Sequence, residues 1–288
     1  MTRVTSQFVR RSHFLLPGLS LPAALALGGL LWAVPAQRTP PAAPKEPVSA
    51  TVRAVPAEIM PPPPAYHFPD KQTWVYSVEW HLFNAGTASV RMEPAGTERH
   101  VVATAGSQGV ANLLYPVHDR FQAAFDPKSF CSLSISKHTE EGSRKRETEI
   151  HFEYSRRKSV LHEKNLKTDE TKRVENDVPA CVTDIVTGFY YLASLPLTPG
   201  AIYSFPINDG GKTAEVKAQV EAREPVKAPA GTFQTLRVEA EATSGLLNGK
   251  GKIWIWYSDD ANHTPVQMRA KLGWGTLLFR LQRVDRQP

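Results

Sequence analysis

Patterns that carry known chemistry are scarce in this sequence. It has two cysteines and nine histidines, none with the HExxH spacing, so no metal site is predicted. A Walker loop and a dinucleotide-binding glycine fingerprint are both missing, which predicts no nucleotide cofactor. Residues 105–109, AGSQG, resemble a nucleophile elbow, but their neighbours favour antiparallel strands rather than the α/β sheet that the elbow requires. We therefore expect no cofactor and no catalysis, and an enzyme is the least favoured alternative.

Charge of one sign is not concentrated in the body of the chain. The 34 lysines and arginines outnumber the 28 acidic residues, but Arg3, Arg10 and Arg11 lie in a leader that precedes the first acidic residue. The densest basic stretches, 144–146 and 156–158, alternate with glutamates that cancel most of their electrostatic field. This pattern predicts a solvated surface and no binding of nucleic acid.

The first 36 residues have the layout of a secretory signal peptide. Residues 14–34 carry no charge, follow the three arginines and lead into the small-residue site Val34-Pro35-Ala36. The uncharged run of 21 residues is also long enough to stay in a bilayer. We predict that residues 1–36 are a signal peptide cut after Ala36 or an N-terminal membrane anchor. The remaining chain is then exported, to the periplasm or the outer face of the inner membrane.

Proline marks the next segment, with ten prolines between residues 37 and 69. Such a segment has little apolar surface to bury and stays extended. We predict a disordered proline-rich linker over residues 37–67 and a single β-rich domain over residues 68–288.

Both cysteines, Cys131 and Cys181, lie beyond this linker. Thiols of exported proteins are usually oxidised, so we predict a disulfide between them. Two separately buried free thiols are the alternative.

Alternation of apolar and polar residues dominates the domain. In the first strand the apolar positions are Trp74, Tyr76, Val78 and Trp80, and a hairpin turn is predicted at 84–86. The same period predicts a second hairpin around residues 140–143, and strands at 214–222, 236–242, 252–257, 266–270 and 276–284.

Two stretches break this alternation. Apolar side chains at three- and four-residue spacing predict a helix over residues 183–194, capped by Thr183 or Asp184, and a short helical turn over 110–115. We therefore predict a mostly β fold, with a strongly curved antiparallel sheet, open or partly closed like a barrel, and one main helix packed on it.

The strand at 252–257 has apolar residues on both faces, and one face must meet something other than the helix. Gly273 and Gly275 remove side-chain bulk nearby and favour a bend in the sheet. Aromatic side chains also line apolar pockets. The residues predicted as possible lining of a ligand groove are Tyr76, Trp80, Trp254, Trp256, Met268 and Trp274. Core packing over the helix is the competing and favoured interpretation of these residues.

Several short motifs occur in an order that resembles one bacterial family. They are Tyr76-Ser77-Val78 before Asn84-Ala85-Gly86, Asp184-Ile185-Val186 before Leu195-Pro196-Leu197, Ala230-Gly231-Thr232-Phe233, and Ile255-Trp256-Tyr257 before Pro265-Val266 and Gly273. Over roughly residues 68–284 this order resembles the exported family called domain of unknown function 3108. Ala193 departs from the arginine expected there. The resemblance implies a single mostly β domain in the cell envelope, and supplies no catalytic residues.

These observations favour a non-catalytic envelope protein that binds an apolar or amphipathic ligand, such as a lipid or the acyl chain of a lipoprotein. A structural or protein-interaction module carried on the proline linker is the alternative. The expected partners are lipid or another envelope protein, and the membrane is expected to be contacted only through an uncleaved N-terminal segment.

Overall fold

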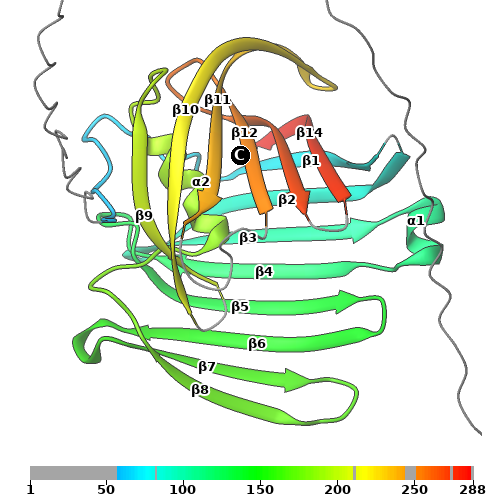
Figure 1. Ribbon diagram of the computed structural model, residues 1–288, viewed down its shortest axis with the longest axis vertical. Coiled ribbons are helices and arrows are strands. Elements are labelled where there is room, and N and C mark those ends of the chain that lie inside the picture. Colours follow the sequence, from blue (N-terminus) through cyan, green and yellow to red (C-terminus); the bar gives the residue numbers. More distant parts are fainter. Residues whose placement is uncertain (1–56, 82, 210–211, 244–250, 273–274, 287–288) are drawn as a thin grey trace, which may run out of the picture. The chain divides into compact units, whose positions relative to one another are not determined.

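The computed structural model describes residues 57–81, 83–209, 212–243, 251–272 and 275–286 (Figure 1). The predicted leader at 1–36 lies outside these residues. In the described chain fourteen strands form one antiparallel sheet, in the order β8-β7-β6-β5-β4-β3-β2-β1-β14-β13-β12-β11-β10-β9. The predicted fold class, a curved antiparallel sheet with one main helix, is confirmed.

The sheet is built outward from β1 on both sides. One half consists of β1 (Gln72–Trp80), β2 (Phe83–Ala95), β3 (Glu98–Ser107), β4 (His118–Phe125), β5 (Ser132–Glu141), β6 (Arg144–Glu153), β7 (Lys158–Asn165) and β8 (Thr171–Asp177). The other half consists of β9 (Ile202–Asn208), β10 (Thr213–Ala228), β11 (Gly231–Ala242), β12 (Gly251–Ser258), β13 (Pro265–Leu272) and β14 (Gly275–Arg286). Between β8 and β9 the chain crosses from one edge of the sheet to the other, and β14 then returns to pair with β1.

Among the described residues, two α-helices and one 3₁₀ turn interrupt the strands: α1 (Gly109–Leu114), Tyr154–Arg156 and α2 (Ile185–Ser194). The helix α2 begins where the sequence predicted, because the Asp184 carboxylate accepts hydrogen bonds from the backbone N–H groups of Val186 and Thr187. It lies on the crossover between the two halves of the sheet (Figure 1). The prediction of a helical turn at 110–115 is confirmed by α1.

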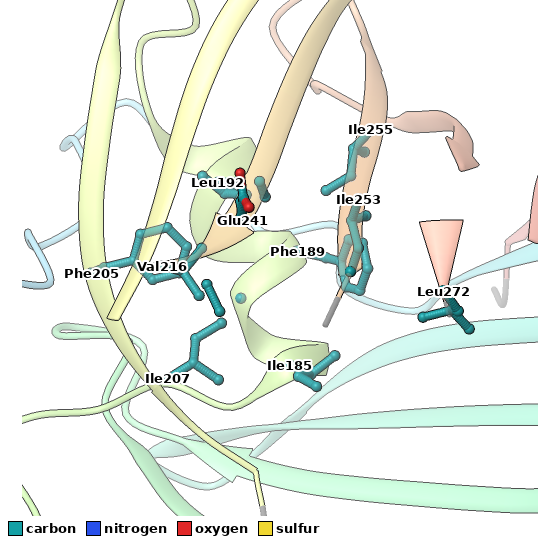
Figure 2. Close-up of a pocket in the computed structure, with 14 residues that line it drawn as sticks. Ile185, Phe189, Leu192, Phe205, Ile207, Val216, Glu241, Ile253, Ile255 and Leu272 are labelled. Carbon is teal, nitrogen blue, oxygen red and sulfur yellow. The ribbon is translucent and has the colours of Figure 1, made fainter. Parts of the chain in front are cut away.

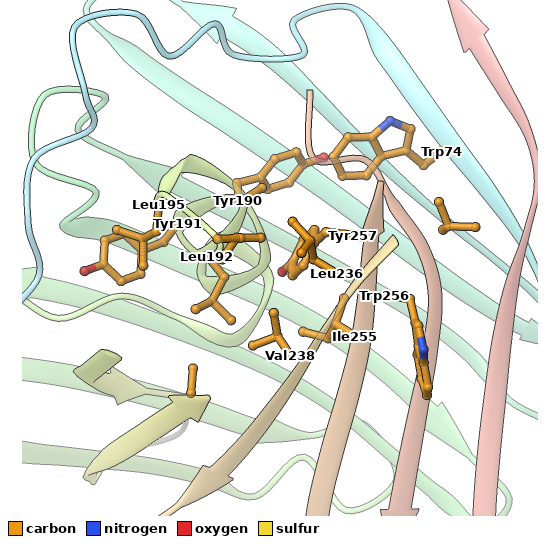
Figure 3. Close-up of a cluster of buried hydrophobic side chains, with 14 of the residues drawn as sticks. Trp74, Tyr190, Tyr191, Leu192, Leu195, Leu236, Val238, Ile255, Trp256 and Tyr257 are labelled. Atoms are coloured by element: carbon orange, nitrogen blue, oxygen red, sulfur yellow. The ribbon is translucent and has the colours of Figure 1, made fainter. Parts of the chain in front are cut away.

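Most of the strands form because one of their faces is apolar. In β10 the residues Ala214, Val216, Ala218 and Val220 are buried, while the intervening side chains are polar. The buried faces meet α2, so Tyr190 stacks on Trp74 with 4.9 Å between ring centroids. Figure 3 shows these aromatic and aliphatic side chains gathered around α2.

A smaller apolar cluster lies under the outer strands, and the disulfide sits close by. This cluster consists of Ile135, Ile150, Phe152, Leu161, Val178 and Val182. Cys131 and Cys181 are bonded, with 5.1 Å between their Cα atoms, so the predicted disulfide is confirmed. It joins the chain just before β5 to the chain just before α2.

Two boundaries in the structure differ from those predicted from the sequence. The first hairpin turns before residue 83 rather than at 84–86, because β2 already begins at Phe83. Asn84, Ala85 and Gly86 instead form an irregularity in the β1–β2 pairing, where Val78 faces Gly86 and Glu79 faces Asn84. Glycine is required at 86, since a Cβ there would lie 2.0 Å from the carbonyl oxygen of Gly106.

The folded domain also starts earlier than residue 68. Within the predicted linker, Ile59 is buried in the main core. The Met60 N–H donates to the Tyr191 hydroxyl at 3.2 Å, and the Tyr66 hydroxyl donates to the Tyr190 carbonyl at 3.4 Å. The last residues of the predicted linker therefore pack on α2 as part of the domain.

Candidate ligand cavity

An apolar cavity of about 250 Å³ lies between α2 and the second half of the sheet (Figure 2). Five strands, β9 to β13, and one face of α2 contribute to it. Its lining residues are Ile185, Gly188, Phe189, Leu192, Phe205, Ile207, Val216, Ala240, Glu241, Ala242, Gly251, Ile253, Ile255 and Leu272.

The helix contributes one continuous stripe of side chains. Ile185, Phe189 and Leu192 are spaced by four and three residues, which places them on the same face of α2. Gly188 lies between them in sequence and brings no side chain to the wall. A Cβ at Gly188 would come 3.5 Å from the Ile207 Cδ1 atom, an ordinary contact distance. The absence of a side chain at Gly188 therefore leaves additional space between this turn of α2 and Ile207.

Apart from Phe205 and Glu241, the strands contribute small and branched side chains. In β12, Ile253 and Ile255 line the cavity, and alternation sends Trp254 and Trp256 to the opposite face. In β11 the lining positions Ala240 and Ala242 carry only a methyl group. The space exists because several facing positions are occupied by alanine or glycine rather than by larger apolar residues.

The chemistry of the lining is almost entirely that of hydrocarbon. Glu241 is the only charged residue among the lining residues, and its carboxylate lies 3.0 Å from the Lys252 ammonium group. The cavity volume is slightly below the ~300 Å³ at which pockets for small molecules usually begin. A single hydrocarbon chain or a small apolar molecule fits this space and this lining better than a bulky polar substrate does.

Of the six residues predicted to line a groove, none of the five that the structure describes lines this cavity. Tyr76 and Met268 belong to the main core or pack against it. The Tyr76 hydroxyl donates to the Pro265 carbonyl at 2.9 Å, and burial raises the pKa of this phenol well above its ordinary value. Trp80 is 39% exposed, and Trp274 lies outside the described residues.

Trp254 and Trp256 have polar neighbours on their own face of the sheet. The Arg269 guanidinium lies 4.6 Å from the Trp254 ring and 5.5 Å from the Trp256 ring. The Trp256 indole N–H donates to a Glu224 carboxylate oxygen at 2.5 Å. The candidate site thus lies on the isoleucine face of β12, whereas the sequence had pointed to the tryptophan face.

Sequence reasoning did not single out Phe189, Ile253 or Ile255 as site residues. All three lie in elements whose type was predicted correctly, but periodicity cannot tell which of two apolar faces meets the helix. The alanines at 240 and 242 were the available signal, because small residues on a core face leave room.

Other kinds of site are not evident in the described chain. In the ranges that the structure describes, no three histidine, cysteine, aspartate or glutamate side chains gather so that they could hold a metal ion. None of the helices in the described part of the chain has the length and apolar character to cross a bilayer.

One buried carboxyl group on β4 has an unusual pKa. Burial raises the pKa of Asp119 to about 6, against the opposing effect of the Glu140 N–H, which donates to this carboxylate at 3.0 Å. Because the folded protein holds this proton more tightly than the unfolded chain, stability falls as the pH rises from about 4 to about 6. Above that range the buried charge remains a constant penalty.

We therefore expect Asp119→Asn to stabilise the protein at pH 7.5 and to change little near pH 4. The amide still accepts the Glu140 N–H, and the gain is about 1–2 kcal/mol after allowance for screening by water. Urea unfolding at both pH values measures it, with Asp177→Asn at an exposed position of β8 as the control. An equal gain at both pH values would show that charge burial is not its cause.

The fold and cavity together define a class of protein: a curved antiparallel sheet that packs on one crossover helix and keeps an apolar space beside it. The chain belongs to the family described as protein of unknown function (DUF3108), which matches residues 75–282. The family resemblance predicted from the short motifs is confirmed. No curated protein matches the chain.

Three solved structures are similar to the chain at low sequence identity, and the first of them shares the fold. The first is a β-barrel-like protein of domain of unknown function DUF1849 from Brucella abortus, with a TM-score of 0.55, 9% identity, and coverage of 81% of this chain and 100% of that one. A candidate exported protein with a YmcC-like fold from Bacteroides fragilis has a TM-score of 0.34 and 10% identity, covering 80% and 100%. A candidate lipoprotein from Parabacteroides distasonis has a TM-score of 0.29 and 9% identity, covering 80% and 99%.

Proposed function

We propose that this protein is an exported, non-catalytic component of the cell envelope that holds the hydrocarbon chain of a lipid or lipoprotein in the cavity beside α2. The observation that carries the proposal is the cavity itself, about 250 Å³ and lined by apolar residues except at Glu241. The cavity is partly open, since Ile185 in its lining is 38% exposed, so apolar side chains face water there. An apolar occupant would remove that surface from water.

The lining residues also favour ligand binding without catalysis. A catalytic site needs an acid, a base or a nucleophile directed at the reacting atoms. Ile185, Phe189 and Ile253 can hold and desolvate a hydrocarbon chain, and they offer no group that transfers a proton. The polar end of an amphipathic ligand would remain outside the cavity.

The disulfide and the sequence of the leader support a location outside the cytoplasm. The Cys131–Cys181 bond is typical of proteins that fold in an oxidising compartment. The uncharged residues 14–34, preceded by three arginines, supply the export signal or the anchor. A domain that binds hydrocarbon chains would have a role in the periplasm, through which lipids and lipoproteins pass between membranes.

The direct test is to extract the natively expressed protein and identify bound lipid by mass spectrometry. We expect an acyl chain in stoichiometric amount. A clean extract from protein that remains folded would contradict the proposal and favour the alternative, a structural or protein-interaction module.

A variant that fills the cavity makes the test specific. Ala240→Leu adds three carbon atoms to the lining, so we expect affinity for a fluorescent polyene fatty acid to fall about tenfold, equivalent to about 1.4 kcal/mol. Ala261→Leu, the same change at an exposed turn residue outside the cavity lining, is the matched control. Equal affinities in the two variants would place the fatty acid elsewhere.

A further inference from the structure

A group of large apolar side chains is exposed at one end of the strands. The described residues include nine exposed large apolar side chains, and six of them belong to α1, to the residue after it, or to the facing ends of β1 and β2. We call these six the apolar rim: Trp80, Phe83, Val110, Leu113, Leu114 and Tyr115. Their exposure rises from 39% for Trp80 to 83% for Leu113.

The elements that carry the six residues also lie close together in the fold. Trp80 faces Phe83 in the β1–β2 pairing. The Gln108 N–H, just before α1, donates to the Ala85 carbonyl of β2 at 2.9 Å. Figure 1 accordingly places α1 at the end of the strands rather than over a face of the sheet.

The described part of the domain leaves most of the apolar rim uncovered. Helix α1 has no buried residue, and neither an acidic residue in its first turn nor a basic residue in its last. The valine and leucine side chains of α1 face water, so the helix gains no stability from their burial. Contiguous exposed apolar surface of this kind marks a site where something else covers it.

The rim also lies close to the cavity across the paired ends of β13 and β14. Leu272, which lines the cavity, faces Gly275 in the β13–β14 pairing. A Cβ at Gly275 would lie only 2.8 Å from the Trp80 indole nitrogen, so β14 begins directly against Trp80. A hydrocarbon chain that leaves the cavity at Leu272 is therefore close to the apolar rim.

We infer that the apolar rim docks onto a lipid bilayer and places the cavity next to the source of its acyl chain. Tryptophan, tyrosine and phenylalanine beside leucine, without charge, are the side chains that settle at the membrane interface. The inference rests on the proposed function for its purpose, and adds a membrane contact made by the folded domain to any made by the N-terminal segment.

The length of chain before the domain is compatible with this contact. Residues 35–56, 22 in number, separate the uncharged stretch from the first described residue. A proline-rich chain of this length spans up to about 70 Å at about 3.1 Å per residue. A domain tethered by residues 14–34 can thus reach the same bilayer with its rim.

Site-specific labelling tests the docking. The two native cysteines are bonded, so an environment-sensitive fluorophore attaches only to an introduced thiol at Leu113→Cys or at the control Ile202→Cys. Ile202 is also an exposed apolar residue, 53% accessible, on the edge strand β9. Each protein is purified with its N-terminus in the form that the expressing cell produces, and is then labelled. It is mixed with vesicles of phosphatidylethanolamine and phosphatidylglycerol that contain a quencher in the acyl region.

We expect strong quenching at residue 113 and little at residue 202. Adding Leu114→Asp should weaken the vesicle signal at residue 113 about tenfold, because a charge at the interface opposes insertion. Equal quenching at the two positions would overturn the inference, and so would label-to-label contact at residue 113 without vesicles, which would assign the rim to a second copy of this chain.

The same variants separate this inference from the proposed function. Ala240→Leu should lose fatty acid and keep the vesicle signal, whereas Leu114→Asp should keep fatty acid and lose the vesicle signal. Failure of the first pair of results contradicts the cavity as the binding site, and failure of the second contradicts the rim as the docking surface.

Discussion

Replacing both Cys131 and Cys181 by serine is expected to lower the free energy of unfolding by about 4 kcal/mol. The bond closes a loop of 50 residues, and in the chain-entropy view it stabilises the fold by restricting the unfolded chain. It also holds the start of β5 next to the residues that lead into α2. Loss of the bond therefore loosens the helix that forms one wall of the cavity.

Denaturant unfolding of the oxidised protein, the reduced protein and the double variant measures this effect. The reduced protein and the double variant should unfold at the same denaturant concentration, well below the oxidised protein. If reduction leaves the midpoint unchanged, the bond does not constrain the unfolded chain. If the variant is much less stable than the reduced protein, the serines themselves disturb the site.

The helix α2 was predictable because local and tertiary signals agree there. Apolar residues recur at three- and four-residue spacing, Asp184 supplies an acceptor for the first free N–H groups, and Pro196 prevents continuation. The cysteine pair was predictable for a different reason, since export and an even number of thiols leave few alternatives.

The face of β12 that meets the helix was not predictable from its pattern. Ile253 and Trp254 are both apolar, so the period of two gives two equivalent faces. The sequence offered the tryptophans as the inward residues because of their size. The fold instead places the Arg269 guanidinium over both indole rings, and a Glu224 carboxylate oxygen accepts the Trp256 indole N–H. These partners lie on other strands.

The outer strand β8 and the packed end of the predicted linker could not be predicted from the sequence for a second reason. Thr171–Asp177 is rich in charged residues, as suits an edge strand that must not pair with another chain, and it carries no apolar period to detect. Ile59 and Tyr66 are isolated apolar residues in a proline-rich stretch. Their burial depends on the surface of α2, which composition alone does not reveal.

Asp184→Ala is expected to lower the free energy of unfolding by about 3 kcal/mol. One oxygen of the buried carboxylate accepts the Val186 and Thr187 N–H groups, each at 2.9 Å, and the other accepts the Ser132 hydroxyl at 2.6 Å. Losing the helix cap costs about 1 kcal/mol. Leaving the fully buried Ser132 hydroxyl without an acceptor costs about 1–3 kcal/mol more.

The same change should weaken fatty acid binding, because Ile185 and Phe189 in the first turns of α2 line the cavity. Asp184→Asn is the matched control, since its amide oxygen still caps the helix and its NH₂ group can donate to Ser132; it should lose less than half as much stability. Chemical unfolding and fatty acid titration measure both effects. Wild-type stability in Asp184→Ala would show that packing alone holds α2 against the sheet, and the cavity wall would then owe its position to Tyr190 and Tyr191 rather than to this carboxylate.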